Sequence, residues 1–214
     1  MIFHLLQNLK IILCYILAYG LSVTISGALK AWVAKKAGDR TADYAGFLTL
    51  DPLVHVDLLG VISVLFTGFG WGSEVPVDLY NIGYPLRDLK ILLVYYAQTL
   101  THILLTSIAI LLVAGLEIAQ LMYIGQTTLG LIAKIVLKSL ISVNIFLAML
   151  RFIQSSIDLI CTHLIEQDPA AAMYIRLGSL VVSLIVLLLI GAQMQLFFAN
   201  VSSSLALLFL KLIG

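Results

Sequence analysis

Residues 21–39 read LSVTISGALKAWVAKKAGD and complete the first long apolar segment of the chain. This segment covers about residues 9–33, so it contains the roughly 20 apolar residues that a helix needs to cross a membrane. Lys35, Lys36 and Gly38 follow its last apolar turn, and a basic pair before a glycine is typical of a helix end. The sequence therefore predicts a membrane-spanning helix that ends in a basic flank.

Composition places the whole chain in a membrane. Of its 214 residues, 62% are hydrophobic and 11% are charged, whereas a water-soluble domain carries roughly 25% charged residues. We expect an integral membrane protein with one transmembrane domain over residues 1–214. The net charge of +1 gives no reason to expect a nucleic acid partner. Cys14 and Cys161 both lie in apolar runs and are interpreted as small buried residues.

Further apolar segments predict more membrane-spanning helices. They cover about residues 89–114, 129–153 and 174–191, and the tail at 197–213 is a candidate sixth helix. The glycine-rich run 58–71 is too short for a full span and suits a re-entrant or hairpin segment. The predicted fold class is therefore all-α, a polytopic membrane protein with about five to six transmembrane helices.

Basic residues predict the orientation of the first helix. Lys35, Lys36 and Arg40 follow it, which favours the cytoplasmic or topologically equivalent side for the next loop. The first apolar run begins almost at Met1 and is long enough to remain as a span. We therefore expect a retained helix here and not a cleaved leader.

Two stretches resemble a known family. Residues 31–60 read AWVAKKAGDRTADYAGFLTLDPLVHVDLLG, and residues 69–78 read FGWGSEVPVD. They resemble the compact bacterial branch of the site-2 protease family, the intramembrane zinc metalloproteases. That family carries H-E-x-x-H-A on its first core helix, then G-D, then G-R-L-T-L-N-P-L-x-H-I-D-P-L-G, and a hairpin ending in G-W-x-x-P-V-P-V-N. The matching positions are Gly38, Asp39, Leu48, Thr49, Leu50, Asp51, Pro52, Leu53, His55, Asp57, Leu59, Gly60, Gly70, Trp71, Val75, Pro76 and Val77.

The resemblance implies a site-2-protease-like core. It also implies the loop motif of that family, formed here by Asp51, Pro52, His55 and Asp57. It becomes thinner after residue 78. The family's third metal ligand is an aspartate, and its counterpart in this chain is Asp158. The resemblance also implies a bacterial inner membrane, or an organelle membrane of bacterial descent.

The metal-binding motif of that family is missing here. Counting back from the G-D pair, H-E-x-x-H falls on Ser26, Gly27, Ala28, Leu29 and Lys30. The motif works because two histidines on one helix face bind zinc while the glutamate moves a proton to and from the metal-bound water. Serine is a poor zinc ligand, glycine has no side chain to act as a base, and lysine brings a positive charge. We therefore expect no cofactor, no catalytic residue, and only a vestigial metal position at Asp158.

Lys30 and Asp158 would then be two costly charges inside a membrane. The resemblance implies that the residues at these positions face one common point, so we expect an ion pair between them in place of the metal. Two alternatives stay open. Lys30 can extend toward the membrane interface beside Lys35 and Lys36, and Arg151 is a competing cation for Asp158.

Other polar residues lie within the apolar segments. His102 is interpreted as a histidine hydrogen-bonded between helices, and Asn144 is a further candidate for such a bond. Lys134 and Lys138 are four residues apart on one predicted helix, where like charges repel. They are interpreted as facing anionic lipid head groups, with an acidic partner subunit as the alternative.

Two functions remain. The first is a catalytically inactive protease relative that serves as a structural or accessory subunit, with other integral membrane proteins and lipids as partners in a multi-subunit complex. The alternative is an active intramembrane protease with an unusual site. That site would be either a metal held by Asp158, His102 and His163, or a dyad of Ser26 and Lys30.

Overall fold

Three long helices dominate the computed structural model, which describes residues 2–67, 70–121, 128–162, 173–175 and 177–185. They are α1 (Ile2–Ala37), α5 (Arg87–Leu121) and α6 (Thr128–Ile160). Each contains a segment that is long and apolar enough to cross a membrane, namely Ile11–Ala37, Arg87–Glu117 and Gly130–Ile160. The described residues contain no strand. This confirms a helical protein with helices long and apolar enough to cross a membrane at three of the predicted segments.

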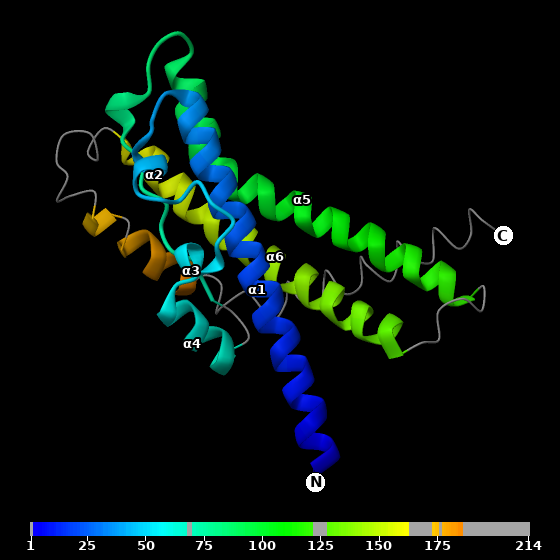
Figure 1. Cartoon of the computed structure of the whole chain (residues 1–214). Coiled ribbons are helices and arrows are strands. Elements are labelled where there is room, and N and C mark those ends of the chain that lie inside the picture. The colour runs from blue at the N-terminus through cyan, green and yellow to red at the C-terminus, as the bar shows by residue number, and fades with distance from the viewer. Residues whose placement is uncertain (1, 68–69, 122–127, 163–172, 176, 186–214) are drawn as a thin grey trace.

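The three helices pack around one another as Figure 1 shows, with α5 and α6 side by side and antiparallel and α1 crossing both. One buried cluster joins Ala34 of α1 to Ile91 and Val94 of α5. A second joins Val23 of α1 to Leu147 of α6. Many large apolar side chains point outward instead, as expected for a surface that faces lipid.

The connection between α1 and α5 consists of short elements. They are α2 (Thr41–Tyr44), α3 (Pro52–His55), α4 (Leu58–Thr67) and the 3₁₀ helix η1 (Leu79–Asn81). At 1.5 Å per residue, α4 rises about 15 Å, which is half of the hydrocarbon thickness.

The chain returns beside the start of α4. Val56 and Gly72 form an antiparallel bridge, and the Ser73 amide donates to the His55 carbonyl at 2.8 Å. Gly60 makes this return possible, because a Cβ on it would lie 2.0 Å from the Trp71 carbonyl oxygen. Residues 56–67 and 70–74, whose ends this contact brings together, are called the hairpin below, and re-entry of the segment into the membrane stays a prediction.

The end of α1 is tied to this connection. Gly38 adopts a φ of +117°, which ends the helix where the sequence predicts. The buried Asp39 carboxylate then accepts hydrogen bonds from the Thr41 amide at 2.9 Å, the Asp78 amide at 2.9 Å and the Asn81 side chain at 3.2 Å. These bonds hold the loop before η1 against the end of α1.

The later predicted helices are described only in part. Residues 173–175 and 177–185 are helical, and Leu184 packs against Phe146 and Leu150 of α6. The remainder of the predicted span at 174–191 and the whole candidate span at 197–213 lie outside the described residues. The predicted total of five to six membrane helices is therefore untested.

Candidate functional site

The α1 face that carries Ser26, Gly27 and Lys30 lies in the interior of the molecule. The Ser26 hydroxyl donates to the Val23 carbonyl of its own helix at 3.3 Å. The Lys30 ammonium donates to a carboxylate elsewhere, at Glu74. A serine–lysine dyad needs the lysine nitrogen next to the serine oxygen. The structure does not bring these two groups together in that way.

Gly27 lies directly under the ring of His55. His55 is 1% exposed, and its Nε2 donates to the Thr49 carbonyl at 2.9 Å. Its Nδ1 has no hydrogen-bond partner among the described residues. A Cβ on Gly27 would lie 2.3 Å from this Nδ1. The imidazole therefore fills the space where a larger side chain at position 27 would begin.

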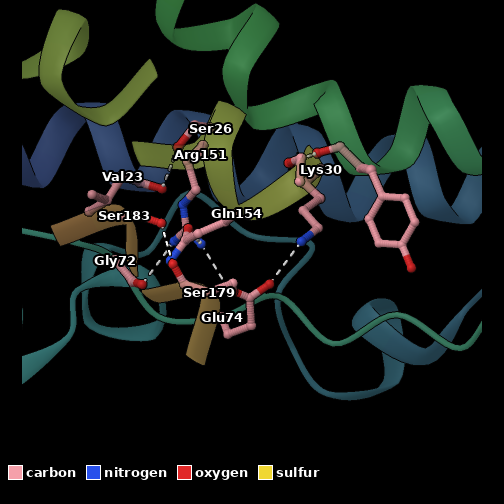
Figure 2. A network of polar contacts seen from close by, with 11 residues as sticks. Val23, Ser26, Lys30, Gly72, Glu74, Arg151, Gln154, Ser179 and Ser183 are labelled. Carbon is pink, nitrogen blue, oxygen red and sulfur yellow. Dashed lines mark hydrogen bonds and ion pairs between the residues drawn. The ribbon is translucent and has the colours of Figure 1, made fainter. Parts of the chain in front are cut away.

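A carboxylate holds two buried cations beside this face, as Figure 2 shows. Glu74 Oε1 lies 2.9 Å from Lys30 Nζ, and Glu74 Oε2 lies 2.8 Å from Arg151 Nη1. The Lys30 and Arg151 side chains are only 7% and 6% exposed, whereas that of Glu74 is 42% exposed. Arg151 also donates to the Gly72 carbonyl at 2.9 Å and to Gln154 at 3.2 Å. The three charged residues join α1, the hairpin and α6.

This arrangement corrects the predicted ion pair between Lys30 and Asp158. The ion pair that the structure gives Lys30 is with Glu74, and Arg151, the predicted competitor for Asp158, also binds Glu74. Asp158 does lie nearby, because it lines the same small polar cavity of about 20 Å³. The prediction did not include the hairpin, which brings Glu74 as a further charged residue beside α1.

The sequence differs from the family motif at Glu74. In the motif G-W-x-x-P-V-P-V-N the first proline corresponds to Glu74, while Gly70, Trp71 and Val75 match on either side. The chain thus departs from the motif by gaining an acid in the hairpin and a base at Lys30. Considering both departures together would have indicated the pair.

The charges around Glu74 determine its protonation. Burial by itself would raise its pKa, but the neighbouring Lys30 and Arg151 outweigh this and lower the pKa of Glu74 from 4.5 to about 2. The carboxylate is therefore ionised at neutral pH. This one carboxylate is shared by the two cations Lys30 and Arg151, and Asp158 lines the same cavity.

A second buried network links α1, α5 and α6. His102 Nδ1 lies 2.8 Å from Asn144 Oδ1, and Asn144 Nδ2 donates to Ser22 Oγ at 2.8 Å. Ser22 in turn donates to the Ala18 carbonyl at 2.7 Å. The interpretation of His102 as a hydrogen bond donor or acceptor between helices is confirmed, and so is that of Asn144.

The predicted alternative metal set receives no test. No group of three or more histidine, cysteine, aspartate or glutamate side chains is positioned to hold a metal within the part of the chain that the structure describes. His163 lies outside that part. The set of Asp158, His102 and His163 therefore stays a prediction.

The residues of the loop motif shape the connection between helices. Asp51 accepts a hydrogen bond from the Leu53 amide at 3.0 Å and so caps α3, whose first residue is Pro52. Asp57 accepts one from the Gly60 amide at 2.8 Å at the start of α4. With His55 held by Thr49, the motif positions α3 and α4 beside α1.

One curated protein matches part of the chain. It is the Bacillus subtilis (strain 168) protein described as "Putative zinc metalloprotease YwhC", which is 46% identical over 57 residues. The match covers 27% of this chain and 26% of that protein, so the chain spans about a quarter of the length of its relative. No family model and no solved structure matches the chain. The match supports a metalloprotease-like relationship for a helical membrane protein.

Proposed function

We propose that this chain is a catalytically inactive relative of the intramembrane zinc metalloproteases of the site-2 family. The observation that carries the proposal is the ion-pair site at Lys30. On the α1 face where the resemblance places H-E-x-x-H, an ammonium is held by Glu74 at 2.9 Å, and an imidazole covers Gly27.

The chemistry of this face supports inactivity. Catalytic zinc needs three protein ligands and an open position for water. Here Ser26 and Lys30 stand at the two histidine positions, and the two cations of the site repel a third. Gly27 offers no base, and the ring of His55 leaves no space in which one could be added. Ser26, Gly27 and Lys30 therefore supply neither the two histidine ligands nor the glutamate base of the zinc mechanism.

The same residues support a structural role. A bound metal ties together the segments that ligate it, and the Glu74 ion pairs tie α1, the hairpin and α6 in a comparable way. A chain that keeps the shape of such a protease without its chemistry is suited to binding membrane proteins without cleaving them. We therefore assign it the role of an accessory subunit in a larger assembly. The bacterial inner membrane is its proposed location, in line with the bacterial relative.

One experiment tests both halves of this proposal. The tagged chain is purified from its native membrane in a mild detergent, its assembly mass is measured, and it is then incubated with zinc and fluorescent single-span peptides. We expect a stoichiometric assembly with another membrane protein and no peptide cleavage above a protein-free control.

Peptide cleavage that a zinc chelator abolishes would contradict the proposed inactivity. A chain that purifies only as an isolated monomer would contradict the accessory role. Because the two readouts are separate, each half of the proposal can fail without the other.

A further inference from the structure

An apolar groove is lined by residues of α5 and α6. It has a volume of about 450 Å³, and its lining includes Ile103, Thr106, Ser107, Ala148, Met149 and Phe152. Its lining is apolar apart from three hydroxyls, of which that of Thr99 is buried without a hydrogen-bond partner among the described residues. The other two bond to carbonyls of their own helix. Thr106 donates to the His102 carbonyl at 2.8 Å, and Ser107 donates to the Ile103 carbonyl at 2.9 Å. The small side chains create the hollow, and its surface is suited to hydrocarbon.

An exposed lysine lies in line with this groove. Lys138 precedes the groove residue Ile145 by seven positions, so both side chains leave the same face of α6, about 10 Å apart along its axis. Its neighbour Lys134, one turn away, is paired with Glu117 of α5 at 3.0 Å. Lys138 makes no hydrogen bond or ion pair with any described residue. No described residue balances this charge, which lies about 10 Å from the groove residue Ile145 along α6.

The depth of Lys138 suits a lipid head group. The spanning segment of α6 begins at Gly130, so Lys138 lies eight residues, or about 12 Å, inside it. At that depth a lysine can extend its ammonium toward the interface while its stem stays in hydrocarbon. Anionic head groups at the interface supply the missing negative charge.

We propose that the groove and Lys138 together bind one anionic phospholipid. One acyl chain lies in the groove between α5 and α6, and the phosphate contacts the Lys138 ammonium. The apolar lining favours an acyl chain over a polar ligand, and the unbalanced charge of Lys138 favours an anionic head group over a zwitterionic one. Figure 1 shows that α1 diverges from α5 and α6 toward the end of α5 at Leu121 and the start of α6 at Thr128.

Native mass spectrometry of the detergent-purified chain tests the site. The chain is titrated with phosphatidylglycerol or with phosphatidylcholine, and the bound lipid is counted. We expect one phosphatidylglycerol to bind in preference to phosphatidylcholine. Lys138→Gln should weaken phosphatidylglycerol binding about fivefold, which corresponds to roughly 1 kcal/mol for one lysine at a lipid surface. Phosphatidylcholine binding should not change.

Two further variants separate the parts of the site. Lys36→Gln removes an exposed lysine at the end of α1 and serves as the matched charge control, for which we expect no change in the count. Ala148→Phe fills the groove and should reduce binding of both lipids while Lys138 is intact. Equal phosphatidylglycerol binding by the wild type and Lys138→Gln would overturn the proposal. So would an Ala148→Phe variant that keeps its lipid but loses a partner protein, because the groove would then hold a transmembrane helix.

Discussion

Replacing Glu74 with alanine is expected to lower the free energy of unfolding by about 3 kcal/mol. The change leaves Lys30 and Arg151, which are both buried, without their shared carboxylate. Removing one partner of a buried ion pair costs roughly 3–5 kcal/mol, and the lower end applies because the Glu74 side chain is 42% exposed. The measurement is the free energy of unfolding of the detergent-solubilised chain with increasing sodium dodecyl sulfate.

Lys30→Met is the matched variant for this prediction. It removes one of the two cations and leaves the one-to-one pair of Arg151 and Glu74, so we expect a cost under about 1 kcal/mol. The test depends on the order of the two effects: Glu74→Ala should destabilise the chain more than Lys30→Met does. If Lys30→Met destabilises the chain as much as Glu74→Ala does, Glu74 is not the shared partner of two buried cations.

Gly27→Ala is expected to destabilise the chain by about 2 kcal/mol, although alanine is the better helix former. The new Cβ would lie 2.3 Å from His55 Nδ1 and 2.9 Å from Cε1. His55 cannot turn away freely, because it is buried, bonded to Thr49, and packed edge-on against Phe47 at 5.5 Å. Overpacking of this kind costs roughly 1–3 kcal/mol. The same unfolding assay measures the effect.

The control for this change lies on the same helix. A Cβ on Gly20 would meet nothing within 4 Å, so Gly20→Ala should be neutral or stabilising by up to about 1 kcal/mol, as alanine exceeds glycine in helix propensity. The double variant Gly27→Ala with His55→Ala should recover part of the stability lost by Gly27→Ala. If Gly27→Ala behaves like Gly20→Ala, the ring of His55 does not fill the space beside Gly27.

The sequence predicts the spanning helices of the described fold because their cause is local. A continuous apolar run of membrane length indicates a helix wherever it packs, so α1, α5 and α6 appear near their predicted positions. The end of α1 is predictable for the same reason, since Gly38 permits a positive φ that other residues disfavour.

The candidate site could be predicted only in part, because its contacts join distant segments. The sequence identifies Lys30 as a charge within an apolar segment, but it does not tell which carboxylate forms an ion pair with it. Glu74 does so because the hairpin returns to α1 through the close contact of Gly72 with Val23. The ring of His55 over Gly27 is likewise a consequence of how α3 packs on α1.

The most direct measurement of the central claim is the zinc content of the chain by inductively coupled plasma mass spectrometry. The protein is purified without chelators in mild detergent and normalised to protein concentration. Lys30, which the resemblance places at a zinc-binding histidine position, is held by Glu74, so we expect far less than one zinc per chain. A stoichiometry of roughly one zinc per chain, lost on changing Asp158 to alanine, would contradict the account.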